Sequence, residues 1–147
     1  MEERVVAVSG GFDPLHVGHV RMIQAAAALG TRLVVIVNGD DFLMRKKGYA
    51  FMPLAERMEI VRALRGVADV VAAIDPDQTV RETLRLVKPH VFANGGDRRA
   101  EADIPEAAVC RELNIEMVFN VGGGKVQSSS ELVQRAGQAG DGDLGEL

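Results

Sequence analysis

The sequence has one cysteine, no tryptophan and only 4% aromatic residues. Because Cys110 stands alone, an intramolecular disulfide is excluded, which suits a reducing compartment, and we expect a cytoplasmic protein. No segment approaches the length of a membrane span, and the apolar run after residues 1–4 is too short for a signal peptide. Acidic residues outnumber basic residues by 21 to 17, which argues against a broad nucleic-acid-binding surface. Any phosphate site must therefore be local.

Apolar residues make up 47% of the 147 residues, enough to form the core of one globular domain. We expect this domain to span residues 1–136. The last segment, residues 137–147, holds four glycines besides its acidic residues. This composition predicts a flexible C-terminal tail.

Strand and helix patterns alternate along the chain. The continuous apolar run at residues 33–37 is typical of a strand buried on both faces of a parallel sheet. Strands are also predicted at 5–8, 67–73, 91–93 and around 117–119. Helices are predicted after residue 19, at 53–65, from a Thr79–Glu82 capping box to residue 88, at 103–113, and from a Ser128–Glu131 capping box to residue 136. The alternation predicts an α/β, Rossmann-like, doubly wound fold with a parallel five-stranded sheet and ligands beyond the carboxyl ends of the strands.

The stretch between the first predicted strand and the first predicted helix has the character of an anion site. Its glycines let the backbone approach phosphate oxygens, and the first N–H groups of the helix carry partial positive charge. His16 and His19, one helical turn apart, would neutralise phosphate charge there. The other interpretation is that the two histidines cap and pack the helix. The remaining candidates in this stretch are Gly10, Gly11, Phe12, Asp13 and Gly18.

The long connection at residues 38–52 interrupts the alternation. It contains the basic residues Arg45, Lys46 and Lys47. Long ordered connections in compact domains are often functional. The sequence supports equally a mobile basic lid over a triphosphate and a solvated basic loop.

Three other motif interpretations fail on spacing. The pair His16 and His19 lacks further zinc ligands, and His90 has no cysteine or acidic neighbour at ligand spacing, so no metal ligands are predicted in the protein. Lys125 follows three glycines but precedes Val126, which excludes a Walker A loop. The turn at residues 10–11 lacks the glycine spacing of a dinucleotide fold.

The sequence His16-Val17-Gly18-His19 after Gly-Phe-Asp-Pro resembles the HxGH signature of the nucleotidyltransferase superfamily that includes cytidylyltransferases. The resemblance runs from about residue 5 to residue 133 and takes in further motifs at residues 53–57, 94–97 and 128–130. Within the superfamily the chain looks most like glycerol-phosphate cytidylyltransferases and heptose 1-phosphate adenylyltransferases, and the motifs at 53–58 and 95–97 favour the heptose type. The arginine that precedes the serine motif in the glycerol-phosphate branch is absent, and only Lys125 stands near it.

The resemblance implies in-line transfer of a nucleotidyl group from CTP or ATP to a small phosphorylated sugar or polyol, with release of pyrophosphate and with Mg²⁺ bridging phosphate oxygens. It assigns the α-phosphate to His16 and His19. The β- and γ-phosphates fall to Lys46 or Lys47, Arg57 and the serines. Nucleotide contacts are expected from Asn94, Gly95, Gly96, Asp97, Ser128, Ser129 and Ser130, and contacts to the acceptor or the lid from Asp13 and Asp40. Proteins of this resemblance are commonly homodimers, and we expect the contact near residues 42–64.

Several alternatives remain open at this point. Arg57 is either a phosphate ligand or a solvated helix charge, Asp97 either lines the nucleoside pocket or forms an Asx-turn, and the serines cap a helix in either case. The chain as a whole is alternatively a non-catalytic nucleotide-binding regulatory module. A flavin or pantetheine adenylyltransferase would need an apolar pocket for a large acceptor. The aromatic residues near the site are few: Phe12, Phe42, Tyr49 and Phe51.

Overall fold

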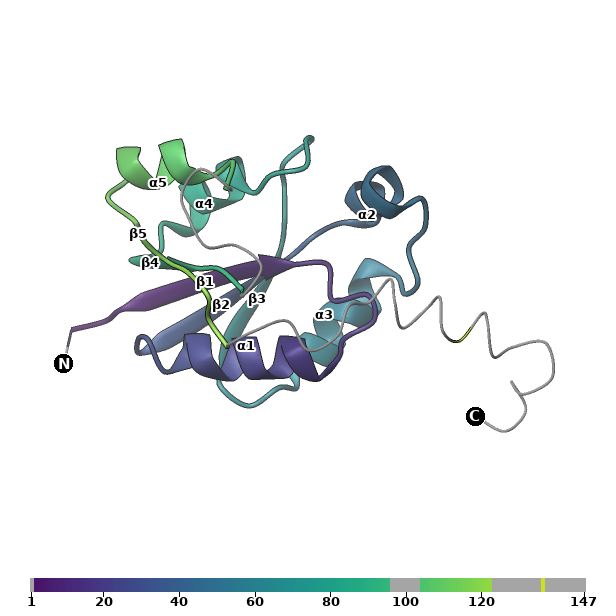
Figure 1. Cartoon of the computed structure of the whole chain (residues 1–147), viewed down its shortest axis with the longest axis horizontal. Helices are drawn as coiled ribbons and strands as arrows, with labels where there is room; N and C mark the ends of the chain where they lie inside the picture. The colour runs from purple at the N-terminus through teal and green to yellow at the C-terminus, as the bar shows by residue number, and fades with distance from the viewer. Residues whose placement is uncertain (1, 96–103, 123–135, 137–147) are drawn as a thin grey trace.

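The computed structural model describes residues 2–95, 104–122 and 136, and the structural statements below concern these residues. Five parallel strands form one sheet in the order β3-β2-β1-β4-β5 (Figure 1). The strands are β1 (Val5–Gly10), β2 (Arg32–Val37), β3 (Val67–Ala72), β4 (Val91–Ala93) and β5 (Glu116–Val118). The predicted single α/β domain with a Rossmann-like parallel five-stranded sheet is confirmed.

Helices cover both faces of the sheet. Figure 1 shows α1 (Val17–Ala27) and α3 (Leu54–Arg62) on one face, and α4 (Arg81–Val87) and α5 (Ala107–Glu112) on the other. The short helix α2 (Asp40–Lys47) lies beyond the carboxyl-terminal edge of the sheet. Among the described residues no helix has the length and apolar character needed to cross a membrane.

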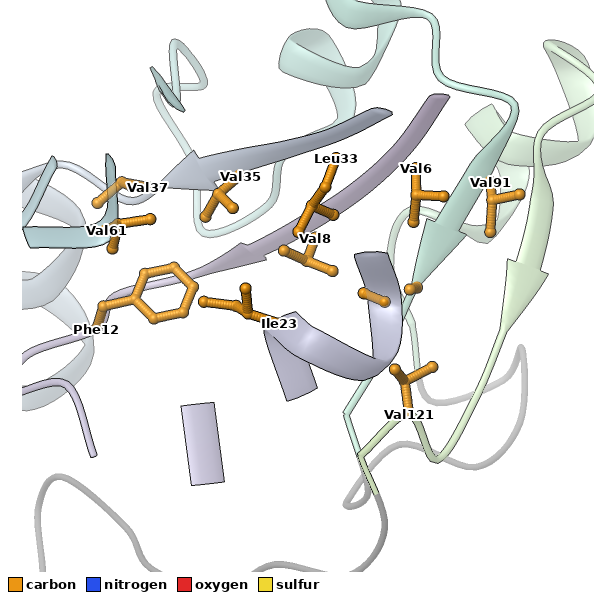
Figure 2. Close-up of a cluster of buried hydrophobic side chains, with 12 residues drawn as sticks. Val6, Val8, Phe12, Ile23, Leu33, Val35, Val37, Val61, Val91 and Val121 are labelled. Atoms are coloured by element: carbon orange, nitrogen blue, oxygen red, sulfur yellow. The ribbon is translucent and has the colours of Figure 1, made fainter. Parts of the chain in front are cut away.

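The core has two layers because alternate side chains of each strand point to opposite faces. Val6 and Val8 of β1 belong to the cluster under α1 and α3, whereas Ala7 belongs to the cluster under α4 and α5. Figure 2 shows the first cluster, in which the ring of Phe12 points toward Ile23 of α1. Phe12 directly follows Gly11 after β1, so this cluster anchors the start of the candidate site to the core.

The strand order predicts a ligand crevice at one end of the sheet. The chain runs outward from β1 to β2 and β3, and then crosses back to β4 on the other side of β1. The order therefore reverses between β1 and β4, and ligands of open α/β sheets bind beyond the carboxyl ends of the strands at such a point. Gly10 ends β1 and Ala93 ends β4, so the two residues flank this crevice.

The connection at residues 38–52 was expected as a loop, but eight of its residues form α2. Its ends match the helix dipole: Asp40 and Asp41 lie in the first turn, and the three basic residues lie in the last. Gly48, at φ 84°, ends the helix in the left-handed conformation. Leu43 is the one buried residue of α2, so no apolar stripe marked the helix in the sequence.

Two helix starts also differ from the prediction. Helix α4 begins at Arg81, and the predicted Thr79–Glu82 capping box is wrong, because the Asp75 carboxylate accepts the N–H groups of Glu82 and Thr83. Helix α5 begins at Ala107 instead of residue 103, since residues 104–106 are not helical. Residue 136 is helical, but the rest of the predicted last helix and the predicted tail lie outside the described residues.

Candidate active site

The turn from β1 into α1 folds tightly against α2. Phe12 holds a positive φ of 52° and is almost fully buried, so its ring fixes the turn. A Cβ on Gly11 would lie 2.8 Å from Leu43 Cδ2 of α2, and a Cβ on Gly10 would lie 3.1 Å from the Phe12 ring. Glycine at both positions therefore lets the turn sit between the aromatic ring and α2.

The two histidines form a capping box at the start of α1. His16 is the N-cap, and its Nδ1 accepts the N–H of Gly18 at 3.1 Å. His19 Nδ1 accepts the N–H of His16 at 3.1 Å. The two imidazole rings stack with centroids 3.8 Å apart, and Phe12 meets His19 edge-on at 5.0 Å. The pair therefore caps and packs the start of α1, and its predicted contact with phosphate remains a prediction.

The same hydrogen bonds decide where the imidazole protons lie. Each Nδ1 accepts a backbone N–H, so a neutral ring carries its proton on Nε2, at the opposite edge. Burial, together with the nearby His16 and Lys47, lowers the pKa of His19 to about 4. His19 is therefore a neutral Nε2–H donor at pH 7. Capping through Nδ1 is therefore compatible with an Nε2–H donor on a neutral ring.

Asp13 joins the turn to the segment after α2. Its carboxylate, which is buried, accepts the N–H of Phe51 at 2.5 Å and of Met52 at 2.7 Å. Lys47 Nζ donates to the carbonyl oxygen of Asp13 at 3.0 Å and lies 3.6 Å from its Oδ2. Asp13 thereby holds Lys47 and residues 51–52 beside the histidine turn.

The two lysines at the end of α2 point to different neighbours. Lys47 lies over the ring of Tyr49 at 4.7 Å from its centroid and also contacts Asp13. Lys46 lies 5.8 Å from the centroid of the Phe42 ring. Lys47 is close enough to the histidines to lower the pKa of His19. The geometry therefore favours Lys47 over Lys46 as the cation of the site.

Arg57 is buried, so the alternative of a solvated helix charge is wrong. Its side chain is 0% exposed. The guanidinium donates to the carbonyl oxygens of Met52 (2.9 Å), Gly11 (2.9 Å) and Asn38 (2.6 Å), and Nη2 donates to Asp40 Oδ1 (2.6 Å). These bonds join the histidine turn, the end of β2, the start of α2 and the start of α3. In this arrangement Arg57 positions the site and has little donor capacity left for a phosphate.

The carboxyl end of β4 carries Asn94 and Gly95. Asn94 is buried, its N–H donates to the carbonyl oxygen of Val118, and its own carbonyl oxygen accepts the N–H of Val121. Gly95 follows at the β1–β4 crevice. Gly96, Asp97, Lys125 and the serines Ser128, Ser129 and Ser130 lie outside the described residues, so their predicted roles remain predictions.

A resident metal centre built by the protein has little support in this part of the chain. No group of three or more His, Cys, Asp or Glu side chains that could hold a metal ion is found among the described residues. Both oxygens of Asp13, the carboxylate nearest the histidine turn, already accept backbone N–H groups.

Sequence reasoning missed one residue of this region, Asn38. It follows β2 directly, is buried, and stands beside Gly10 through a hydrogen bond from its N–H to the Gly10 carbonyl oxygen at 2.9 Å. The only sequence signal was its place, a polar residue immediately after the apolar run at residues 33–37.

Fold and site together are those of a nucleotide-handling α/β domain, and a family model agrees. The model for "Cytidylyltransferase-like" proteins matches residues 7–135. The chain belongs to this family, and the predicted nucleotidyltransferase superfamily is confirmed.

The similar proteins fall into two groups. The chain is 47% identical over 117 residues to the bifunctional protein HldE of Streptomyces coelicolor, which covers 78% of this chain and 25% of HldE. It is 47% identical over 97 residues to HldE of Methylococcus capsulatus, covering 65% of this chain and 20% of that protein. The chain thus spans a quarter or less of these relatives. It is also 34% identical over 115 residues to an FAD synthase of Pyrococcus horikoshii, with 77% of each chain covered.

Solved structures share the fold. A lipopolysaccharide core biosynthesis protein from Thermoplasma volcanium matches with a TM-score of 0.68 and 24% identity, covering 80% of this chain and 96% of that one. Pantoate-beta-alanine ligase from Francisella tularensis matches with a TM-score of 0.57 and 14% identity, covering 89% of this chain and 65% of that one. These two likenesses concern the fold alone.

Proposed function

We propose that the chain transfers a nucleotidyl group from ATP or CTP to a small sugar phosphate or polyol phosphate. A phosphate oxygen of the acceptor attacks the α-phosphorus, the bond from that phosphorus to the bridging oxygen breaks, and pyrophosphate leaves with the electron pair. The acceptor is already anionic near neutral pH, so no strong general base is needed. Catalysis then depends on alignment and on neutralising the charge that grows on the transferring and leaving oxygens.

The observation that carries this proposal is the orientation of the histidine pair. Hydrogen bonds to both Nδ1 atoms keep the neutral tautomer with Nε2–H, and the lowered pKa keeps His19 neutral. Donors fixed in advance at the position where charge develops are worth more than donors that must reorganise. His16 and His19 would donate to the α-phosphate and the bridging oxygen, and Lys47 would contact the phosphates from the end of α2.

Relatives favour a sugar phosphate and ATP. Identities of 47% to two HldE proteins support an adenylyl transfer to a heptose 1-phosphate or a similar acceptor. The FAD synthases of Pyrococcus support a second candidate, adenylyl transfer to FMN. Small acceptors fit this chain better, because Phe12 is buried in the core and leaves few aromatic side chains to line a flavin pocket.

Mg²⁺ belongs to this proposal as part of the nucleotide substrate. When bound, it would neutralise charge on the β- and γ-phosphate oxygens. Asn94 and Gly95, and in the predicted set Gly96 and Asp97, would line the nucleoside pocket, and the serine motif would contact phosphate. We further propose a cytoplasmic homodimer.

A pyrophosphate-release screen tests the proposal. It crosses ATP, CTP, GTP and UTP, each with Mg²⁺, against glycerol 3-phosphate, glucose 1-phosphate, mannose 1-phosphate, heptose 1-phosphate and FMN. We expect release with ATP or CTP and a sugar or polyol phosphate. Release with FMN alone would establish the second candidate, and no release with any pair would contradict both.

A further inference from the structure

Asn38 presents an unsatisfied oxygen at the edge of the site. Its backbone is held on both sides: its N–H donates to the Gly10 carbonyl oxygen at 2.9 Å, and its carbonyl oxygen accepts Arg57 Nη1 at 2.6 Å. The residue is 6% exposed, and its Oδ1 is buried with no hydrogen-bond partner among the described residues. It is the sole side-chain atom of this kind in the described part of the chain. Leaving such an oxygen unpaired destabilises the fold, because the oxygen has lost its water without gaining a donor.

The place of Asn38 in the sheet separates it from the nucleoside pocket. The crevice at the point where the strand order reverses lies between β1 and β4, and Asn94 and Gly95 follow β4 there. Asn38 follows β2, which flanks β1 on the opposite side. The turn that carries the histidines starts from β1, between the two. A ligand group at Asn38 therefore approaches the histidines from the side opposite the nucleoside.

The polar groups around Asn38 suit a ligand with hydroxyl groups. A Cβ on the next residue, Gly39, would meet nothing within 4 Å, so the chain leaves open space at the residue that follows Asn38. Asp40 follows, with a half-exposed carboxylate of which Oδ1 already accepts Arg57. An amide oxygen and a carboxylate are acceptors, and hydroxyl groups are the donors that sugars and polyols supply.

We propose that Asn38 Oδ1 accepts a hydrogen bond from a hydroxyl group of the acceptor substrate and so selects polyhydroxylated phosphates. This inference rests on the proposed function and identifies a residue that binds the non-reacting part of the acceptor substrate. Arg57 and Gly10 hold the Asn38 backbone, so the main chain from which the side-chain amide projects is fixed before the substrate binds. A site built to bond a hydroxyl discriminates strongly against an analogue that lacks it, because the buried polar group is then left unpaired.

The test compares Asn38→Leu, which is similar in size but has no acceptor, with Asn38→Asp, which keeps an oxygen. The probe is whichever of glycerol 3-phosphate, glucose 1-phosphate, mannose 1-phosphate and heptose 1-phosphate the unmodified chain uses best. We expect Asn38→Leu to raise the KM for that acceptor about 10-fold or more, with the KM for the nucleotide unchanged, and Asn38→Asp to recover part of the loss. Thr83→Val is the matched control, because Thr83 is a buried polar residue bonded to Ile74 and Asp75, away from Asn38.

Monodeoxy analogues of the same acceptor give the second arm. With the unmodified chain, removing one particular hydroxyl from the acceptor should raise the acceptor KM by a similar factor. With Asn38→Leu, removing the same hydroxyl should not raise the KM further. The inference would be overturned if Asn38→Leu kept the acceptor KM of the unmodified chain. It would also be overturned if no monodeoxy analogue changed the KM of the unmodified chain. Either result would leave the transfer reaction intact. If Asn38→Leu fails to fold, the analogue series and Asn38→Asp decide. An unmodified chain that releases no pyrophosphate with any pair removes the proposed function, and the inference with it.

Discussion

At the residue scale, His16 caps helix α1 and is proposed to donate to phosphate, and substitutions separate these two roles. Asparagine at position 16 keeps an N-cap oxygen near the place of Nδ1 but has no Nε2–H, whereas alanine has neither. We expect His16→Asn to fold with near-normal stability and to lose about 10²–10³ in kcat. His16→Ala should lose similar activity and, in addition, about 1 kcal/mol of unfolding free energy. Urea denaturation and initial rates measure the two effects, and near-normal turnover in His16→Asn would refute the catalytic duty.

His19 should make the stability of the fold depend on pH. Its pKa is lowered from 6.5 to about 4, mainly by burial, so between these values the unfolded chain binds a proton that the folded chain does not. Unfolding free energy should therefore fall as the pH drops through this window, by about 2 kcal/mol between about pH 7 and about pH 5. Above the window this contribution is constant.

The variant His19→Asn isolates this contribution to the pH dependence. Asparagine does not titrate in this range and keeps an oxygen close to the place of Nδ1. Urea denaturation at the two pH values should show a smaller loss for the variant than for the unmodified chain. Equal losses in both would mean that the pKa of His19 is not lowered in the folded state.

At the scale of elements, the hydrogen bonds of the Arg57 guanidinium join four segments of the chain. Replacing it with methionine would leave the carbonyl oxygens of Gly11, Asn38 and Met52 without their donor. We expect Arg57→Met to lower the free energy of unfolding by about 3 kcal/mol or more, since each orphaned buried acceptor costs about 1–3 kcal/mol. Arg62, an exposed residue of the same helix, is the control, and Arg62→Met should stay within about 0.5 kcal/mol. Equal effects of the two substitutions in urea denaturation would show that the network is not what stabilises this edge.

Elements with strong local patterns were predictable from the sequence. Residues 91–93 form β4 as expected, and α3 follows Pro53 with Leu54 and Met58 packed against the core, because periodicity and helix-boundary residues are local signals. Helix α2 escaped prediction because tertiary contacts hold it: one buried leucine, the Asp40–Arg57 pair and the Lys47–Asp13 pair. The burial of Arg57 was equally invisible, since Gly11, Asn38 and Asp40, three of its four acceptors, lie 17 to 46 residues away in the sequence.

In the candidate site, too, the sequence predicted contiguous features and missed contacts between distant residues. The histidine pair and its turn are contiguous in the sequence, so their proximity was certain once a helix followed. The roles of Asp13 and Lys47 depend on a contact across 34 residues, which no local pattern reports. Asn38 gave no signal beyond its place after an apolar run, because an unsatisfied oxygen is a property of the folded chain.

For the whole molecule, we expect a homodimer whose contact includes residues 42–64. Three of the large apolar residues that the described chain exposes fall in this segment: Met44, Phe51 (58% exposed) and Ile60. Light scattering at micromolar concentration should give the dimer mass, and Phe51→Glu should shift it toward the monomer. Leu86→Glu, an exposed residue of α4, should leave the mass unchanged. A monomer mass for the unmodified chain would contradict the dimer. A dimer mass that Phe51→Glu leaves unchanged would contradict only the placement of the contact at residues 42–64.

The central claim for the whole molecule is that this family member joins a nucleotide to an acceptor phosphate. The most direct measurement counts pyrophosphate and the nucleotide-linked product in one reaction of the 147-residue chain with its best substrate pair and Mg²⁺. We expect one pyrophosphate for each product molecule, and none when either substrate is omitted. Pyrophosphate or phosphate released without acceptor, or no linked product with any pair, would contradict it.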